Sequence, residues 1–409
     1  MLDPYKIRQD FPMIRDGVKM QGHPLIWLDN ASTTFKPDCV RNEIDLYLTK
    51  MTSNSHRGDY DLCFEVDKKI AETRAEVASF INAEPNEIVF SSGTTMSLNM
   101  VAYGYGEKFL KPGDEILLSE AEHASNLLPW FTVAKRCGAK VTYVPLDEEG
   151  KVTIENFKKA LSPRTKIVSL AMVTNVLAFL LPIKELTKLA HEYGAIMIVD
   201  GAQSVPHMPI DVKDLDCDFL AFSGHKLCGP TGIGVLYGKY SLLDKMDSFL
   251  SGGGMNASFH KCGDVSLLPP PLRFEAGTQN IEGIFGLGAA IKYLKKIGMK
   301  NIDDYEKELK SYAVKKIEET GNAIIYNPNS EGAIVTFNIE DVFAQDAATY
   351  LNSRGIACRS GQHCAKILID FLKTVATVRA SFYIYTTKED IDALADAIKH
   401  GKEFLDAYF

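Results

Sequence analysis

The residues best suited to covalent chemistry lie in a turn between two apolar segments, residues 219–223 and 232–238. The turn carries Ser223, His225 and Lys226. Apolar runs bounded by glycine and proline are typical of buried strands, so we expect the Lys226 amine at the mouth of a buried sheet. An amine that loses its hydration has a lowered pKa, which favours Schiff-base formation. A lysine that extends from a strand end into solvent is the alternative interpretation.

A carboxylate ends the apolar segment that precedes this turn. Residues 195–200 form an apolar run that closes with Asp200. The carboxyl end of a parallel strand is where open α/β sheets bind ligands. A carboxylate there can keep a pyridine nitrogen protonated, because an opposite charge in contact shifts a pKa by about 1–3 units. Asp200 and Lys226 together indicate pyridoxal 5'-phosphate as the cofactor. The glycines of residues 229–234 do not follow the dinucleotide pattern and are weak evidence for a nucleotide loop.

Two short segments carry a resemblance to a known family. Residues 200–203, Asp-Gly-Ala-Gln, and residues 223–226, Ser-Gly-His-Lys, resemble the cofactor motifs of the class V aminotransferase family. Within this family the sequence is similar to the group II cysteine desulfurases, the SufS-like branch. The resemblance extends from residues 28–33 to the C-terminal helix. It implies an α/β fold, the type I pyridoxal-phosphate fold, with a mostly parallel sheet, helices on both faces and a smaller α+β domain.

The resemblance implies a phosphate site. Residues 92–95 follow an expected strand and open a helix. Hydroxyl groups and free N–H groups at a helix N-terminus can bind an anion, although the same residues are typical of an ordinary N-cap. Thr95, Ser223 and His225 resemble the phosphate ligands of the family. Thr278 resembles a phosphate ligand that the partner subunit supplies, which implies a homodimer.

His123 and Gln203 match residues that surround the pyridoxal ring in the family. The histidine at the position of His123 stacks on the ring and assists proton transfers, so the resemblance makes it a catalytic candidate. Gln203 resembles the residue that bonds the ring's hydroxyl oxygen. A single histidine after a strand is more often structural, which is the alternative for His123. The second histidine common in the branch is Ala124 here.

A second chemical cluster lies in the loop of residues 360–365, where Cys364 follows His363. An unperturbed thiol, with a pKa of about 8.5, is only slightly ionised at neutral pH and needs a cationic neighbour to become reactive. A single cysteine is more often a buried, inert side chain. The loop nevertheless resembles the motif of SufS-like enzymes in which Cys364 is the catalytic cysteine. Gln362 stands where that motif has its first histidine.

Three residues match substrate-binding positions of the family. Arg379 matches the arginine that pairs with the substrate carboxylate, a planar group suited to bidentate binding, and Arg359 is its expected assistant. Asn175 resembles a residue that helps to hold the same carboxylate. The bulky residues 177–182 depart from the family pattern, and we expect them to narrow or reshape the pocket wall. Residues 341–346 lack the histidines of relatives that work with a zinc-bearing acceptor.

The resemblance implies a cysteine desulfurase that converts L-cysteine to L-alanine. Lys226 would hold the cofactor and remove the α-proton, and Cys364 would receive the sulfur as a persulfide. A SufE-like or SufU-like acceptor protein would then take the sulfur for iron–sulfur cluster assembly. Selenocysteine lyase and cysteine sulfinate desulfinase are alternatives on the same scaffold, for which Cys364 matters less. A catalytically silent scaffold protein is a further alternative, against which the presence of both residues counts.

The composition bounds the class of protein. The chain of 409 residues has 46% hydrophobic and 24% charged residues, which is ordinary for a globular enzyme. A net charge of −8 argues against nucleic acid or an anionic membrane as partner. No signal peptide is evident, and the most apolar stretch, residues 177–183, is too short to span a bilayer, so we expect a cytoplasmic protein. The eight cysteines form no CxxC pair, which favours reduced thiols over disulfides or a zinc site, and no metal is expected.

The order of elements predicts two domains and an N-terminal segment. Alternating strands and helices predict a large cofactor-binding domain over residues 23–280. Residues 281–409 read as a small C-terminal domain that carries the cysteine loop, and residues 1–22 as a segment that packs with it. Strands are expected at residues 24–29, 87–91, 115–119, 140–145, 166–172, 195–200, 219–223, 232–238, 323–326 and 333–338. Helices are expected at residues 4–12, 38–51, 60–82, 155–161, 183–193, 281–297, 301–320, 344–353 and 388–407, with a loop at 54–58.

Overall fold

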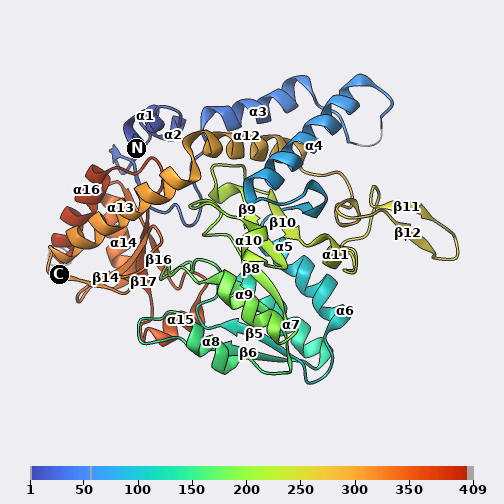
Figure 1. Cartoon of the computed structure of the whole chain (residues 1–409). Coiled ribbons are helices and arrows are strands. Elements are labelled where there is room, and N and C mark those ends of the chain that lie inside the picture. The colour runs from blue at the N-terminus through green and yellow to red at the C-terminus, as the bar shows by residue number, and fades with distance from the viewer. Residues whose placement is uncertain (1, 56–57, 403–409) are drawn as a thin grey trace.

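A central sheet organises the large lobe of the protein (Figure 1). The computed structural model describes residues 2–55 and 58–402. Within these ranges the sheet has seven strands, in the order β4-β10-β9-β8-β7-β5-β6. The strands are β4 (Ile88–Ser91), β5 (Glu115–Ser119), β6 (Lys140–Val144), β7 (Thr165–Ala171), β8 (Ile196–Asp200), β9 (Phe219–Ser223) and β10 (Gly234–Gly238). Among these seven described strands β10 alone runs opposite to the other six, so the predicted mostly parallel α/β sheet is confirmed.

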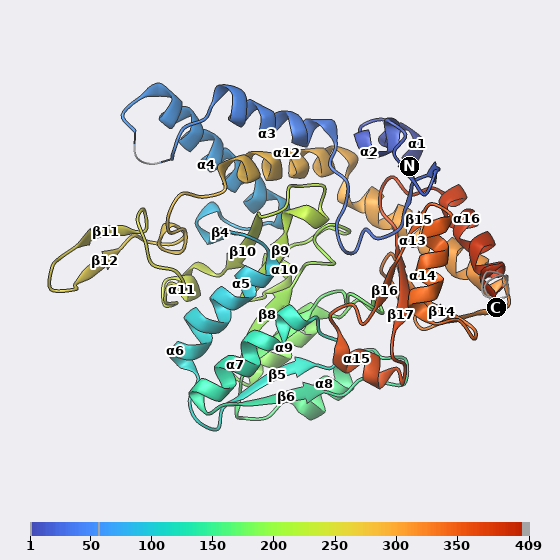
Figure 2. The ribbon, with the colours of Figure 1, turned by 180° about the vertical axis from the view of Figure 1, so that it is seen from behind.

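Both faces of this sheet are covered by helices. Met197 and Val199 of β8 enter one apolar core, whereas Ile198 enters the core on the other face, as the two-residue period of a strand requires. Three helices cover the first face in Figure 1: α8 (Ile154–Ala160), α9 (Ile183–Glu192) and α10 (Val212–Leu215). Two helices cover the second face, which Figure 2 shows from behind: α5 (Thr94–Val101) and α7 (Leu128–Cys137). Burial on both faces explains why the central strands β8 and β9 are mainly apolar.

Three longer helices extend the first core beyond β10. They are α3 (Asp38–Lys50), α4 (Asp61–Ile81) and α12 (Ile281–Ile297), which lie side by side in Figure 1. The close approach of α12 to α4 depends on Gly288, because a Cβ there would lie 2.7 Å from the hydroxyl oxygen of Thr73. The buried face of α12 therefore belongs to the core of the large lobe.

The small lobe is built on an antiparallel sheet in the order β13-β14-β17-β16. Its strands are β13 (Ala323–Ile325), β14 (Ile334–Ile339), β16 (Arg359–Gly361) and β17 (Thr377–Ser381). The helices around it are α13 (Met299–Glu318), α14 (Ala344–Ser353), α15 (Lys366–Phe371) and α16 (Lys388–Lys399). Val335, Phe337 and Val378 lie at the centre of the lobe's own apolar core.

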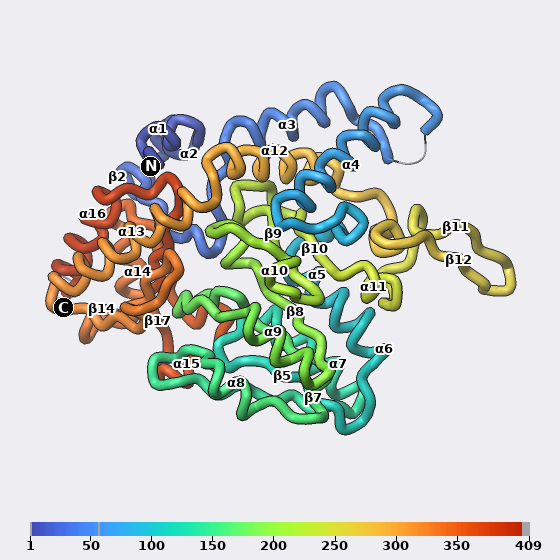
Figure 3. Tube along the Cα trace, in the orientation of Figure 1, coloured from blue at the N-terminus to red at the C-terminus, as the bar shows by residue number. Residues whose placement is uncertain are grey.

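The N-terminal segment contacts the end of the chain. It contains α1 (Pro4–Arg8), α2 (Pro12–Arg15), β1 (Lys19–Met20), β2 (His23–Pro24) and β3 (Ile26–Trp27). Arg8 of α1 forms an ion pair of 3.1 Å with Asp390 in the first turn of α16, and Figure 3 shows the two helices at the same end of the molecule. β3 pairs in parallel with β15 (Ile356–Ala357) of the small lobe. The division into residues 1–22, 23–280 and 281–409 stays a prediction. Helix α12, at the start of the predicted third part, packs with the large lobe.

Most predicted elements occur within one or two residues of their expected bounds. A hairpin, β11 (Asn256–Phe259) and β12 (Val265–Leu267), projects from the large lobe in Figure 1 and was not predicted. Neither were α15 and the short helices α6 (Glu107–Phe109) and α11 (Tyr240–Leu243). The predicted C-terminal helix ends at Lys399, and residues 403–407 of that prediction lie outside the described residues, as do 56–57 of the predicted loop.

The described part of the chain contains no helix that is long and apolar enough to cross a membrane.

A buried ion pair fixes the edge of the central sheet and supplies a test of the fold. Arg74 of α4 donates to both carboxylate oxygens of Glu275, each at 2.8 Å, and Glu275 accepts from the Phe90 N–H of β4. Replacing Glu275 with alanine leaves a buried, uncompensated guanidinium, so we expect the free energy of unfolding to fall by about 3–5 kcal/mol. Urea denaturation measures this loss.

The double variant Arg74→Met/Glu275→Leu is the matched control for this test. It removes both charges at once, so it should retain more stability than Glu275→Ala alone. A single variant that loses less than about 1 kcal/mol, the range of an exposed ion pair, would show that the pair contributes as little as surface pairs do.

Candidate active site

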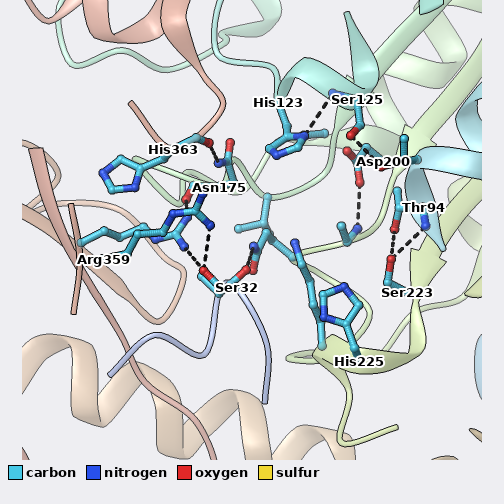
Figure 4. A pocket seen from close by; sticks show the side chains of 18 residues that line it. Ser32, Thr94, His123, Ser125, Asn175, Asp200, Ser223, His225, Arg359 and His363 are labelled. Carbon is cyan, nitrogen blue, oxygen red and sulfur yellow. Dashed lines mark hydrogen bonds between the residues drawn. The ribbon is translucent and has the colours of Figure 1, made fainter. Parts of the chain in front are cut away.

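A cavity of about 220 Å³ lies where the carboxyl ends of the parallel strands meet the small lobe. This edge of an open α/β sheet is the usual ligand site. Ten predicted site residues line the cavity: Thr95, His123, Asn175, Asp200, Gln203, Ser223, His225, Lys226, Arg359 and Arg379. Figure 4 shows hydroxyl groups on one side of the cavity and the Arg359–Asn175 group on the other. Cys364 and Thr278 are not part of this lining.

Lys226 and Asp200 are the two charged groups at the floor of the cavity. Lys226 ends the turn Gly224–Lys226 after β9, and Asp200 is the last residue of β8. Burial lowers the pKa of Lys226 to about 8, although the nearby Asp200 charge opposes the shift. Burial also raises the pKa of Asp200, which the N–H of Ala202 opposes with a hydrogen bond of 2.9 Å. The pair therefore combines an amine that loses its proton easily with a carboxylate in need of a cationic partner.

Four hydroxyl groups gather at the N-terminus of α5. Ser223 Oγ accepts from the Thr94 N–H at 2.8 Å and lies 2.7 Å from Thr94 Oγ1. Thr95 Oγ1 lies 2.8 Å from Ser125 Oγ. Hydroxyl and backbone donors at a helix start favour an anion. Sequence reasoning named Thr95 and Ser223 but missed Thr94 and Ser125. Thr94 lies within the segment 92–95 that was expected to bind phosphate, whereas no sequence pattern pointed to Ser125.

Two of the three histidines that line the cavity, His123 and His225, are uncharged at neutral pH. Burial, together with the nearby Lys226 charge, lowers the pKa of His123 to about 4. The same two causes lower the pKa of His225 to about 4. Nδ1 of His123 accepts from the Ser125 N–H at 3.1 Å, so its hydrogen is on Nε2. His123 can therefore offer a neutral ring face and one N–H to the cavity.

The opposite side of the cavity is built around a buried arginine. Arg379 of β17 is 2% exposed and forms an ion pair of 3.2 Å with Asp29. Its Nη2 and the Nη1 of Arg359 both donate to Ser32 Oγ, at 3.1 and 3.0 Å. Nε of Arg379 is buried without a partner in the part of the chain that the structure describes. Two guanidinium groups that converge on one hydroxyl make a cationic site for a carboxylate. Ser32 was missed as a site residue, although it lies in the segment 28–33 that carries the resemblance.

Two buried amides leave oxygen atoms unpartnered in the cavity. Gln203 donates from Nε2 to the carbonyl of Ala31 at 2.8 Å, and Asn175 donates from Nδ2 to the carbonyl of His363 at 2.8 Å. Oδ1 of Asn175 and Oε1 of Gln203 have no partner among the described residues. Buried polar atoms without partners are rare in folded proteins and indicate a missing polar ligand. Together with the hydroxyl cluster and Asp200, these atoms suit pyridoxal phosphate, which carries a phosphate, a ring nitrogen and a ring hydroxyl.

The predicted thiol lies beside the cavity. Cys364 is exposed and lines an adjacent groove of about 610 Å³, which shares Arg359 and His363 with the cavity. His363 and Cys364 are both left-handed, with φ of +52° and +57°, a conformation that costs a non-glycine residue about 1–2 kcal/mol. The carbonyl of Cys364 accepts from the Ala124 N–H at 2.8 Å. The loop is therefore held in a strained shape by its contacts.

Thr278 lies at a different small cavity, which it lines together with Asn54, Ser55 and Gly277. It is exposed on the described surface. Thr278 does not line the Lys226 cavity of its own chain. That it serves the partner subunit stays a prediction.

The expectation that residues 177–182 narrow the pocket wall is wrong. None of them is among the described residues that line the cavity. Leu177 and Phe179 are instead buried in an apolar cluster with Ala365 and Leu368, at the start of α15. Ala178 takes the left-handed conformation, with φ of +57°. The bulky side chains therefore support the segment that follows Cys364 rather than the cavity itself.

Comparisons with known proteins agree with this geometry. The family model "Aminotransferase class-V" matches residues 26–394. A "Probable cysteine desulfurase" of Halalkalibacterium halodurans is 46% identical over 100% of both chains. A "Cysteine desulfurase" of Haloferax volcanii is 41% identical over 98% of this chain and 97% of its own.

Two solved structures share the fold over nearly the whole chain. A cysteine desulfurase from Thermococcus onnurineus matches with a TM-score of 0.93 and 37% identity, over 100% of this chain and 99% of its own. The cysteine desulfurase CsdA from Escherichia coli matches with a TM-score of 0.91 and 36% identity, over 99% of each chain. The family match spans both lobes and every residue that lines the cavity. The chain therefore belongs to the class-V aminotransferase family.

Proposed function

We propose that this protein is a pyridoxal-phosphate-dependent cysteine desulfurase, which converts L-cysteine to L-alanine and leaves the sulfur on Cys364. One observation carries the proposal. A single cavity places Lys226 and Asp200 opposite Arg359 and Arg379, and the loop with an exposed cysteine borders it. The relative that is 46% identical over its full length and named a probable cysteine desulfurase supports the same activity.

The cavity offers a partner for each polar part of the cofactor. The hydroxyls of Thr95 and Ser223, with His225, would hold the phosphate, and Asp200 would hold the proton of the ring nitrogen. His123 offers a ring for stacking. Lys226 would form the covalent link through Nζ, which its low pKa favours. When bound, pyridoxal phosphate supplies an electron sink at the α-carbon of the substrate.

Lys226, Arg359 and Arg379 have separate tasks in this proposal. The two guanidinium groups bind and orient the substrate carboxylate. Nζ of Lys226 removes the α-proton, because an amine with a pKa near 8 is a base that regains its proton easily at neutral pH. The neutral His123 can move a further proton through Nε2.

The sulfur step needs the thiol of Cys364. Its Sγ attacks the sulfur of L-cysteine, so an S–S bond forms while the bond from that sulfur to the β-carbon breaks. The electron pair stays with the carbon, which takes up a proton to give the methyl group of L-alanine. The products are L-alanine and a persulfide on Cys364, so this half of the reaction consumes no external oxidant or reductant.

The position of Cys364 favours a second candidate. In this conformation the thiol lines the groove and not the Lys226 cavity. Selenocysteine lyase or cysteine sulfinate desulfinase activity, which depends less on a nucleophilic thiol, is therefore the alternative on this scaffold. A serine at position 364 distinguishes the two.

The proposal extends to the sulfur acceptor, the oligomeric state and the cellular compartment of the protein. An exposed Cys364 can pass its sulfur to an acceptor protein, which we propose to be SufE-like or SufU-like and to serve iron–sulfur cluster assembly. We also propose a cytoplasmic homodimer of the SufS-like type, in which Thr278 completes the partner's phosphate site. The exposed apolar side chains of the hairpin, Phe259 and Val265, support a contact surface there.

Replacement of Cys364 by serine tests the desulfurase activity. A serine hydroxyl is a weak nucleophile at neutral pH and cannot form a persulfide, so alanine release from L-cysteine should fall about 100-fold or more. The cofactor spectrum should be retained, and mass spectrometry should find no added sulfur on the loop. Cys262→Ser, another exposed cysteine, is the matched control and should keep full activity. A serine variant that desulfurates L-cysteine at nearly the wild-type rate would contradict the role of Cys364 and favour the lyase or desulfinase activity.

The pH dependence of cofactor attachment tests the state of Lys226. Only the neutral amine attacks an aldehyde, and burial lowers the pKa of Lys226 to about 8. The rate at which apo-protein attaches pyridoxal phosphate should therefore rise with pH and level off above a midpoint near 8. Borohydride reduction and mass spectrometry of the Lys226 peptide measure this rate. A rate that still rises tenfold per pH unit up to pH 10 would contradict the lowered pKa.

A further inference from the structure

The peptide that joins His363 to Cys364 is held by a side chain from a distant part of the chain. Its carbonyl, on His363, accepts from Nδ2 of Asn175 at 2.8 Å. The next carbonyl, on Cys364, accepts from the N–H of Ala124. Because both residues are left-handed, this peptide has an orientation that the chain alone disfavours. The orientation of the peptide between His363 and Cys364 sets the direction in which the Cys364 side chain leaves the backbone.

Other contacts of the loop hold different atoms. The His363 ring lies 3.0 Å from the hydroxyl of Thr377 through Nε2, which fixes the imidazole. Ala365 and Leu368 are buried in the apolar cluster with Phe179, which fixes the start of α15. Neither contact bonds the carbonyl of His363. Among the described residues, Asn175 is the one that donates to that atom.

Asn175 itself belongs to the carboxylate-binding side of the cavity. It is 6% exposed, and its backbone carbonyl accepts from Nη1 of Arg379 at 2.8 Å. An amide NH₂ group has two hydrogens, of which His363 uses one, so the second is free for a ligand. Oδ1 is unpartnered. One side chain can therefore contact the bound ligand and the thiol loop at the same time.

We propose that Asn175 is a positioning residue that couples occupation of the carboxylate site to the placement of Cys364. The resemblance assigned Asn175 to substrate binding alone; the geometry adds the loop. A carboxylate on Arg379 draws the second amide hydrogen of Asn175 toward it, and this fixes the amide plane that holds the His363 carbonyl. The thiol loop is then most ordered when substrate is present. The identity of the carboxylate ligand rests on the proposed function, whereas the anchor itself does not.

Hydrogen exchange on the holoenzyme, without substrate, tests the anchor. The amide of Cys364 belongs to the peptide that Asn175 holds, so Asn175→Ala should speed exchange in residues 361–366 about fivefold, the effect of one lost hydrogen bond. Asn175→Asp keeps the shape but cannot donate, and should act in the same way. Gln203→Ala is the matched control, because this equally buried amide bonds Ala31 instead. Unchanged exchange in both Asn175 variants, or an equal rise in Gln203→Ala, overturns the proposal.

A second measurement starts from the wild-type holoenzyme, so its first part also covers the case of a variant that misfolds. Saturating L-alanine, which carries the α-carboxylate of the substrate, should slow exchange in residues 361–366 of the wild-type holoenzyme several-fold, and this protection should be lost in Asn175→Asp. Protection that persists in Asn175→Asp, or is absent from the wild type, contradicts the coupling. Both measurements are made without turnover. A protein that fails to release sulfur from cysteine but shows these effects would refute the proposed function and leave the anchor standing.

Discussion

The site depends on keeping the Lys226 amine in a poorly hydrated place next to the buried Asp200 carboxylate. Neither group would be tolerated there alone, because an isolated charge in a protein interior is costly. The parallel arrangement of β8 and β9 supplies the pairing, since Asp200 ends one strand and Lys226 lies in the turn after the next. Burial of Lys226 makes it an amine of low basicity, and the carboxylate of Asp200 favours a protonated ring. Each pKa shift follows from the group's own burial, and the charge of the partner limits it.

A second buried charge joins the two lobes. Arg379 comes from the small-lobe sheet, its partner Asp29 from the N-terminal segment, and its acceptor Asn175 from the loop after β7 of the large lobe. Three segments far apart in the sequence therefore meet at one guanidinium. This explains why the carboxylate side of the cavity lies between the lobes, and why the loop with Cys364, which follows β16, reaches the same place.

The sequence sufficed for residues whose position follows from strand order. Asp200 and Lys226 end apolar segments, so the sheet brings them together by necessity. Ser125 and Ser32 could not be predicted in this way, because they reach the cavity through loop conformations that no periodicity records. The role of residues 177–182 was misjudged for the same reason: their bulk was visible, but not the direction in which the left-handed Ala178 turns them. The β11–β12 hairpin escaped notice because its strands are exposed and lack a buried apolar face.

The unpartnered atoms of the cavity have a thermodynamic consequence. Oδ1 of Asn175, Oε1 of Gln203 and Nε of Arg379 are buried without hydrogen-bond partners among the residues that the structure describes. Each such atom costs roughly 1–3 kcal/mol relative to its solvated state. The fold therefore tolerates a local loss of stability, from unsatisfied polar atoms, at the place where ligands bind. A ligand that satisfies these atoms binds the native state and not the unfolded chain, so loading the cavity should raise the melting temperature of the whole molecule. Without a ligand the native state is less stable, so the apo-protein should be the form that is most easily unfolded and cleaved by proteases.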